Sequence, residues 1–148
     1  MSVMLVCSPG GHLLEMRELA PAWEGEQVSW VTLPGADVDD LLRGQDVTLA
    51  HGPTNRSISK LLRNVVLAWR EVRRRRPEAI LSTGAALAVP FFVVGRLHGA
   101  RTVYVESLAR TQSLSLSGKL VYPLATSFFV QWPGATTWRR ARYVGSIL

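Results

Sequence analysis

The stretch VMLVCSPGGHLLEM, residues 3–16, joins an apolar run to a helical pattern through a turn that contains two glycines. The run VMLVC predicts a buried strand, and GHLLEM predicts the first turns of a helix. A strand that passes directly into a helix is the building unit of parallel α/β sheets. This stretch therefore predicts the fold class, and it places glycine and histidine where a strand gives way to a helix.

The same alternation continues along the chain. Further strand patterns cover 27–33, 46–52, 78–84, 101–107 and 126–132, and the tail 140–148 is a candidate for one more. Helical patterns cover 11–21, 36–44, 57–76, 85–99 and 115–125. Short links between them predict an α/β fold, a Rossmann-like doubly wound parallel sheet covered on both faces. No repeat and no internal boundary is visible, so we expect a single domain over 1–148.

Two helical patterns stand out. The pattern over 57–76 is amphipathic, with an apolar stripe made of Ile58, Leu61, Leu62, Val65, Val66 and Trp69. The pattern over 85–99 is apolar all round, and Pro90 is expected to kink it or to shorten its first part. Such a helix fits the core, but the Phe91–Phe92 pair also allows an exposed patch that faces a membrane.

The composition limits the class of protein. Apolar residues make up 47% of the 148 residues and charged residues 19%, which fits a folded domain and argues against disorder. Cys7 is the single cysteine, which excludes an internal disulfide framework and indicates a reducing compartment. The start of the chain is too short for a secretory signal, and the longest apolar run, 85–95, is shorter than the roughly 20 residues that span a bilayer. We expect a cytoplasmic protein that can still rest on a membrane surface.

The net charge of +6 includes an arginine-rich run, REVRRRRPE, at residues 70–78. A run of this kind is usually a solvated helix end, where arginine suits the helix dipole, and anionic lipid is a second possible partner. It is not accompanied by an RNA-recognition or helix-turn-helix signature, so we expect no nucleic-acid partner.

Ligands of a doubly wound sheet bind beyond the carboxyl ends of its strands. Four loops lie there: SPGGH at 8–12, GPTNRS at 52–57, STGAA at 82–86 and ESLAR at 106–110. Candidate chemistry is expected in these loops, with Asn55 and Arg56 of the second loop as the weaker candidates.

The first loop offers Ser8, Gly10 and Gly11 before the helix. It matches neither a dinucleotide fingerprint nor a P-loop. Its backbone N–H groups lie at a helix N-terminus, where a phosphate is favoured, and glycine permits close approach of a ligand. Two glycines alone favour a plain tight turn. His12 is either a cap or a proton acceptor, and Glu15 is either a first-turn anion or a ligand contact.

The other two loops have similar alternatives. Ser82, Thr83 and Gly84 form either an ordinary capping turn or an anion-binding turn. Glu106, Ser107 and Arg110 follow a predicted central strand, and a glutamate there needs a partner. The partner is either Arg110, in an internal ion pair, or hydroxyl or phosphate groups of a ligand. Cys7 ends a buried strand and is expected to be core rather than a nucleophile.

Taken in order and spacing, SPGGHLLEM, LSTGAALAVPF, VYVESLAR and SGKLVYPLATSFFVQWP resemble a known family. It is the acceptor-side, membrane-recruiting subunit of the split N-acetylglucosaminyltransferases that extend dolichol- or polyprenyl-linked sugars. Eukaryotic members anchor the enzyme that adds the second sugar to dolichol-linked N-acetylglucosamine, and bacterial members work in exopolysaccharide or capsule assembly. The resemblance covers residues 3–148. A more distant likeness is to the N-terminal half of the peptidoglycan glycosyltransferase that makes lipid II.

The resemblance implies the N-terminal, acceptor-binding half of a GT-B glycosyltransferase. It implies a separate donor-binding chain, a UDP-sugar at the shared cleft and a polyprenyl-diphosphate-linked acceptor. Transfer of N-acetylglucosamine or another hexose would be inverting, with no metal and no cofactor, and the subunit would be inactive without its partner. The eukaryotic subunit has an N-terminal transmembrane helix that is not seen here, so membrane contact would be peripheral and would use the 85–95 run and basic residues.

The resemblance also implies roles for the candidate residues. The turn of Ser8, Gly10 and Gly11 would cradle the diphosphate. His12 would accept the proton of the attacking hydroxyl or orient the acceptor, and Glu106 and Glu15 are the other candidate bases. The remaining substrate contacts would come from Ser82, Thr83, Gly84, Ser107 and Arg110.

Three other readings stay open at this point. A nucleotide-binding oxidoreductase domain is disfavoured by the absent G-x-G-x-x-G. A non-catalytic membrane scaffold for a glycosyltransferase shares most features with half an enzyme. A basic RNA-binding module would show salt-dependent binding to RNA.

Overall fold

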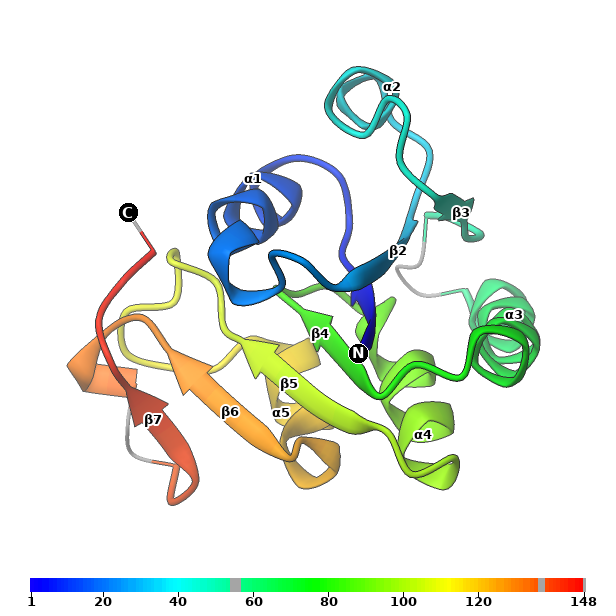
Figure 1. Ribbon diagram of the computed structural model, residues 1–148. Helices are drawn as coiled ribbons and strands as arrows, with labels where there is room; N and C mark the ends of the chain where they lie inside the picture. The colour runs from blue at the N-terminus through cyan, green and yellow to red at the C-terminus, as the bar shows by residue number, and fades with distance from the viewer. Residues whose placement is uncertain (54–56, 136–137, 148) are drawn as a thin grey trace.

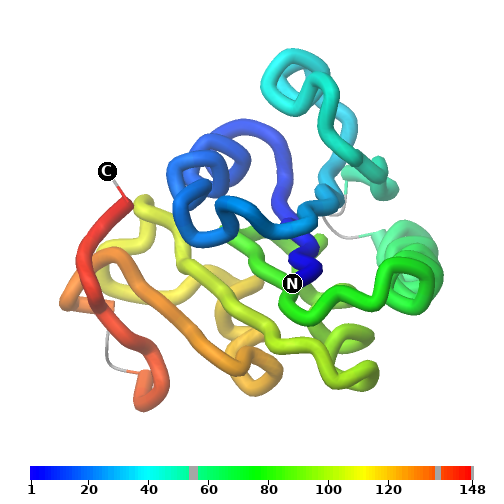
Figure 2. Tube along the Cα trace, viewed as in Figure 1, coloured from blue at the N-terminus to red at the C-terminus, as the bar shows by residue number. Residues whose placement is uncertain are grey.

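The computed structural model describes residues 1–53, 57–135 and 138–147 (Figures 1 and 2). Within these residues a seven-stranded sheet has the order β3-β2-β1-β4-β5-β6-β7, and every neighbouring pair is parallel. The strands are β1 (Ser2–Val6), β2 (Gln27–Thr32), β3 (Val47–Leu49), β4 (Ala79–Ser82), β5 (Arg101–Val105), β6 (Ser127–Val130) and β7 (Ala141–Tyr143). The expected parallel sheet is confirmed, and the tail does add a strand.

The helices follow the predicted segments but are shorter. They are α1 (Gly11–Glu18), α2 (Ala36–Leu41), α3 (Ile58–Arg75), α4 (Ala88–Leu97) and α5 (Leu116–Val121), with 3-10 turns at Ala20–Ala22, Tyr122–Leu124 and Pro133–Ala135. Pro90 is the third residue of α4, which begins at Ala88 instead of 85, so the expected shortening is confirmed. Proline is tolerated in a first turn because the N–H groups there have no partner inside the helix.

Helices lie on both faces of the sheet, as its alternating side chains require. Met4 and Val6 of β1 join a core cluster with residues of α3, α4 and α5. Val3 and Leu5 of the same strand, with Cys7 just after it, join a second cluster with residues of α1 and α2. The sheet is therefore doubly wound, as predicted.

One part of the sheet is less covered. Figure 1 shows no helix over the face of β5 and β6 that is turned toward the viewer. Val103 and Phe129 are partly exposed there and line an apolar cavity of about 310 Å³ with Leu19 and Ile147. The coverage expected on both faces is complete only on the face of α3, α4 and α5.

Helix α3 turns its apolar stripe outward, although a stripe of this kind usually faces a core. Its buried residues are Asn64, Leu67, Ala68, Glu71 and Val72. The Asn64 amide donates to the backbone oxygen of His51 and accepts from its N–H, both at 2.9 Å. Glu71 accepts from the guanidinium of Arg75 at 2.9 Å. These inward polar contacts hold the helix against the segment around β3 and leave the stripe in solvent.

Of the two alternatives for the 85–95 run, the core is confirmed, and the exposed membrane-facing patch built on Phe91 and Phe92 is wrong. Phe91 and Phe92 are both fully buried in the core cluster that includes Ile80. A helix that is apolar all round is stable where protein surrounds it. None of the helices within the described residues combines the length and the hydropathy needed to cross a bilayer.

Candidate functional site

The loops that follow β1, β4 and β5 meet at one edge of the sheet. These three strands are neighbours and parallel, so their carboxyl ends point the same way. Hydrogen bonds join the three loops directly, from His12 to Thr83 and from Leu108 to Glu15. The structure thus brings together residues that are far apart in the sequence, at the edge where α/β sheets bind ligands.

His12 lies in the first turn of α1, half-buried, with its imidazole held by the turn after β4. Its Nδ1 is 3.0 Å from the backbone oxygen of Thr83, and the Thr83 hydroxyl donates to the backbone oxygen of His12 at 2.6 Å. A carbonyl oxygen only accepts, so Nδ1 must carry the hydrogen of this bond. In the neutral ring, Nε2 then has the free lone pair that a proton acceptor needs.

Gly84 makes room for this imidazole. A Cβ added at Gly84 would lie 2.5 Å from Cε1 of His12 and 2.7 Å from its Nδ1. The φ of Gly84 is +142°, in the region that side-chain-bearing residues rarely adopt. The glycine of the STG turn therefore serves the position of His12 rather than a direct contact with an anion.

The glycine turn before α1 already holds an anionic oxygen. Gly10 has a φ of +82°, and its N–H donates to Oδ2 of Asp37 at 2.7 Å. Ser8 is half-buried and Gly11 is exposed at the start of the helix. Carboxylate and phosphate oxygens accept from the same kind of N–H group, so the contact identifies the Gly10 amide as an anion-binding donor.

Glu15 ties α1 to the loop after β5. Its Oε1 accepts from the N–H of Leu108 at 3.0 Å and from the hydroxyl of Ser107 at 3.4 Å. Its Oε2 is buried and has no hydrogen-bond partner among the described residues. A buried oxygen without a partner is costly, which makes Oε2 a candidate acceptor for a ligand hydroxyl.

Glu106 is buried, with 1% of its surface exposed. Oε1 accepts from the N–H of Ser107 at 3.0 Å, and Oε2 accepts from the N–H of Ser115 at 2.9 Å. The Ser115 hydroxyl, which caps α5, donates to the same carboxylate at 3.0 Å. Burial and the nearby Glu106 carboxylate raise the pKa of Tyr104. In this geometry Glu106 holds the loop after β5 in place.

The remaining predicted residues differ in their accessibility. Ser82 and Thr83 are fully buried, and the Ser82 hydroxyl accepts from the N–H of Gly84 at 3.2 Å. Arg110 is exposed, and no ion pair between it and Glu106 is seen among the described residues. Asn55 and Arg56 lie outside the described residues.

Sequence reasoning missed Asp37, Ser115 and Gly118. Asp37 follows β2, whose carboxyl end lies beside that of β1, so an acid in this loop was a recognisable candidate once the strand order is known. Asp37 and Asp39 also form an Asp-x-Asp triplet, but residues two apart on a helix point to different sides. Ser115 and Gly118 have no local signal, because both act on Glu106 through the folded loop.

Neither a metal cluster nor a reactive thiol is evident in the part of the chain that the structure describes. No group of three or more His, Cys, Asp or Glu residues there is placed to hold a metal ion. Cys7 is fully buried, and burial raises its pKa to about 12, so the thiol is held protonated, as expected of a core cysteine.

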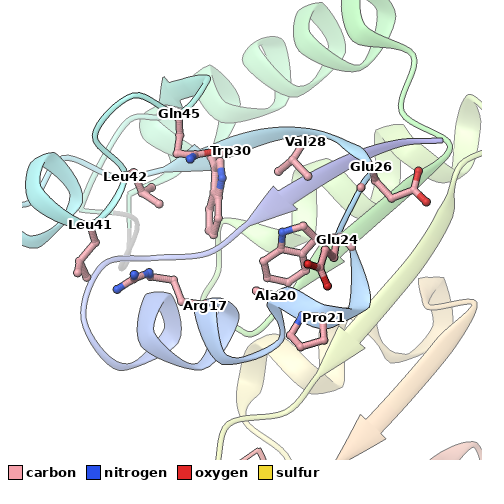
Figure 3. Close-up of a pocket in the computed structure, with 12 residues that line it drawn as sticks. Arg17, Ala20, Pro21, Glu24, Glu26, Val28, Trp30, Leu41, Leu42 and Gln45 are labelled. Atoms are coloured by element: carbon pink, nitrogen blue, oxygen red, sulfur yellow. The ribbon is translucent and has the colours of Figure 1, made fainter.

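A cavity of about 670 Å³ lies away from this edge (Figure 3). It is found near the amino ends of β2 and β3, where Trp23 and Trp30 pack edge to face with ring centroids 6.0 Å apart. Arg17, Leu42 and Gln45 also line it. None of the candidate residues is among its lining, so we place the site at the carboxyl edge.

Comparison with known proteins gives a family match. The family described as "Oligosaccharide biosynthesis protein Alg14 like" matches residues 36–147. The UDP-N-acetylglucosamine transferase subunit ALG14 of Eremothecium gossypii is 38% identical over 124 residues, which are 77% of this chain and 55% of the relative. The subunit of the same name in Homo sapiens is 33% identical over 59% of this chain and 44% of the relative. The chain thus spans about half the length of these relatives.

Solved structures share the fold. Acinetobacter baumannii MurG aligns with a TM-score of 0.78 at 18% identity, over 96% of this chain and 45% of that one. The UDP-GlcNAc 2-epimerase of Methanocaldococcus jannaschii aligns with a TM-score of 0.73 at 11% identity, over 99% of this chain and 46% of that one. The Rossmann-like fold, matching about half of a GT-B glycosyltransferase, is confirmed.

Proposed function

This chain belongs to the Alg14-like family of oligosaccharide biosynthesis proteins, and from that premise we propose that it is the acceptor-binding subunit of a two-component glycosyltransferase. The observation that carries the proposal is His12, whose Nδ1 is bound to the Thr83 carbonyl and whose Nε2 is left as the proton acceptor. Its relatives are named as subunits of a UDP-N-acetylglucosamine transferase, which supports a UDP-sugar as donor.

The acceptor we propose is a polyprenyl-diphosphate-linked saccharide. The diphosphate would bind at the turn of Ser8, Gly10 and Gly11, where the backbone N–H groups and the start of α1 favour an anion. The acceptor hydroxyl oxygen attacks the anomeric carbon of the donor sugar and passes its proton to Nε2 of His12. The bond from that carbon to the UDP oxygen breaks, and UDP leaves with the electron pair. The sugar is N-acetylglucosamine or another hexose, transferred with inversion and without metal.

The other site residues have supporting roles in this proposal. Glu15, whose Oε2 has no hydrogen-bond partner among the described residues, is the alternative proton acceptor. Glu106 positions the loop that carries Ser107 and Arg110, instead of touching the substrate, because its oxygens are buried and bound within the loop. Arg110, exposed at this edge, would meet the diphosphate or the saccharide.

A second chain would hold the donor. The relatives are named as subunits of a transferase, which supports a partner chain. Residues 1–148 would form the acceptor domain, and the partly uncovered sheet at β5 and β6 offers an apolar surface for that partner. The subunit would be inactive alone and would lie at the cytoplasmic face of a membrane, where a polyprenyl acceptor resides. The relatives named above are not exopolysaccharide proteins, so we propose oligosaccharide rather than exopolysaccharide assembly.

Reconstitution tests this function. The chain is purified alone and together with a small donor-binding subunit from the same genome, then given a UDP-sugar and a polyprenyl-diphosphate-linked N-acetylglucosamine. We expect a product one sugar longer from the pair and none from either chain alone, because neither holds both substrates. Mass spectrometry of the lipid-linked product gives the readout.

A scaffold would give a different result. If the partner alone transfers the sugar in detergent at the rate of the pair, this chain contributes no chemistry and only recruits the enzyme. Tight binding of a nicotinamide cofactor by this chain would instead favour an oxidoreductase domain.

Asp37 gives a second prediction, about anion binding at the glycine turn. Its carboxylate occupies the Gly10 N–H at 2.7 Å, so it competes with a phosphate for the same donor. Asp37→Asn is expected to bind inorganic pyrophosphate about fivefold more tightly, because removing one nearby negative charge is worth about 1 kcal/mol at a partly exposed site. The measurement is an NMR titration that follows the Gly10 and Gly11 amide signals.

Asp39→Asn is the matched control, because it removes the same charge from the exposed side of α2. It should change the affinity by much less than Asp37→Asn. Equal effects of the two variants would show that Asp37 acts only through net charge. No pyrophosphate binding in any of the three proteins would count against the proposed diphosphate site.

A further inference from the structure

The outer face of α3 is an exposed apolar stripe. Its members and their exposed fractions are Ile58 76%, Leu61 44%, Leu62 60%, Val65 39%, Val66 67% and Trp69 46%. They recur at three- and four-residue spacing, so they form one continuous face of the helix. Scattered exposed apolar residues are ordinary on a protein surface, whereas a contiguous patch of this kind marks an interaction site.

Helix α4 widens this surface. It packs beside α3 in the layer behind the sheet (Figure 1) and exposes Val93 by 40% and Leu97 by 71%. The rings of Trp69 and His98 meet edge to face with centroids 5.0 Å apart, which joins the two helices at this end. We call the α3 stripe together with Val93 and Leu97 the apolar platform.

Cationic side chains border the apolar platform. Arg63 and Arg70 are seven residues apart and therefore lie on the same side of the stripe, where they line a groove of about 300 Å³ with Leu62 and Val66. The guanidinium of Arg73 lies 6.0 Å from the centre of the Trp69 ring. The single acid of α3, Glu71, faces inward and is bound by arginines, so the outward face carries positive charge alone.

The orientation of α3 is fixed by its inward contacts. Asn64 holds the backbone of His51 in two hydrogen bonds, and Glu71 holds Arg75, which also reaches Asp46 before β3. Turning the stripe inward would break these bonds. The exposed stripe is therefore a stable property of the fold.

We propose that the apolar platform docks onto an anionic lipid surface. A helix with an apolar face and arginines at its border lies in the plane of a bilayer, with the apolar side chains below the headgroups and the cations among the phosphates. The inference rests on the proposed function for its membrane setting. The membrane contact is then α3 with Val93 and Leu97 of α4, whereas Phe91 and Phe92 of the 85–95 run stay in the core.

This docking places the site toward the lipid. Strand β3 ends at the carboxyl edge of the sheet, and the first turn of α3 lies there too, because the Lys60 ammonium donates to the backbone oxygen of Gly52 at 2.9 Å. The platform therefore starts at the edge of the sheet that carries His12 and the glycine turn. A lipid-linked diphosphate at the bilayer surface would approach this edge from the platform side.

Vesicle sedimentation of the full chain tests the proposal, without partner, donor or acceptor. Vesicles of phosphatidylcholine mixed with the anionic lipid phosphatidylglycerol are compared with vesicles of pure phosphatidylcholine. We expect binding to the anionic vesicles that weakens with salt, because salt screens the arginines. Leu62→Glu/Val66→Glu should lower that binding at least tenfold. Arg63→Ser/Arg70→Ser should lower it on anionic vesicles and leave the weak binding to neutral vesicles unchanged.

The matched control is Leu14→Glu/Val144→Glu, which adds the same charges at apolar positions that are 53% and 76% exposed outside the platform. This control should bind anionic vesicles nearly as well as the wild type, with only a small loss from the change in net charge, whereas Leu62→Glu/Val66→Glu should not. Unchanged vesicle binding by Leu62→Glu/Val66→Glu overturns the proposal. A second result would also overturn it: light scattering shows that the wild type is a dimer, and Leu62→Glu/Val66→Glu is a monomer that still binds vesicles. The surface would then join two protein chains. An inactive reconstituted pair leaves the vesicle result as it stands, so the two proposals fail separately.

Discussion

Replacing His12 with alanine is expected to lower sugar transfer by the reconstituted pair by about 100-fold or more, the usual contribution of a general base. The Thr83 carbonyl holds Nδ1, so the lone pair of Nε2 is the group that the variant removes from the carboxyl edge of the sheet. Turnover at saturating UDP-sugar and acceptor is the measurement. Unfolding by urea should show a much smaller effect, because the half-buried ring contributes little to the core.

Two further variants separate a proton acceptor from a residue that only orients the acceptor. His12→Gln keeps a hydrogen-bonding side chain of similar length but cannot take a proton, so it should be nearly as inactive as His12→Ala. Gly84→Ala keeps the histidine but inserts a Cβ at 2.5 Å from the position of its Cε1, so it should lower transfer by displacing the ring. A His12→Ala pair with full activity would remove His12 from the mechanism and leave Glu15 as the candidate base.

The sheet was predictable because its evidence is local. Each buried strand is a short apolar run, and short links to helices leave parallel pairing as the ready solution. The rule that ligands meet the carboxyl ends of such strands then brought His12, Glu15 and Glu106 to one edge. The hydrogen bonds of His12 to Thr83 and of Glu15 to Leu108 show that this convergence is real.

What each side chain does at that edge was not predictable in the same way. Glu106 was expected among the substrate contacts, but Ser115, nine residues later, turns its carboxylate inward. Asp37, in the first turn of α2, accepts the hydrogen bond of the Gly10 N–H. Both contacts depend on how the segments after the strands fold over the edge of the sheet. Unlike helices and strands, such segments have no periodic hydrophobic pattern from which their conformation could be predicted.

The facing of the helices shows the same limit. Amphipathicity identified α3 correctly, yet a stripe does not say which side of a helix meets the protein. Two hydrogen bonds from Asn64 to His51 and the burial of Glu71 settle it, and these contacts join separate segments. The 85–95 run was ambiguous for a related reason, since a segment that is apolar all round fits both a protein core and a membrane. In the structure it contributes to the core.

Gly118 is the second position where we expect a large effect, here on folding stability. A Cβ at Gly118 would lie 2.2 Å from Oε2 of Glu106 and 3.2 Å from the hydroxyl of Ser115. The Glu106 carboxylate cannot move aside easily, because the residue is only 1% exposed and its oxygens accept hydrogen bonds from Ser107 and Ser115. Gly118→Ala must therefore move α5 or break these bonds, and we expect a loss of about 2–4 kcal/mol in the free energy of unfolding in urea.

A control and a rescue make that result specific to the contact between Gly118 and Glu106. Gly11→Ala adds a Cβ that meets nothing within 4 Å at the start of α1, so it should leave the stability unchanged or slightly raised. Glu106→Asp withdraws the carboxylate by one methylene, which relieves the clash but also weakens the bonds to Ser115. The double variant should lose less unfolding free energy than the sum of the losses of the two single variants, because the shorter acid leaves room for the alanine. If Gly118→Ala unfolds at the same urea concentration as the wild type, the loop after β5 is looser than its hydrogen bonds imply, and Glu106 is then free to turn toward a substrate.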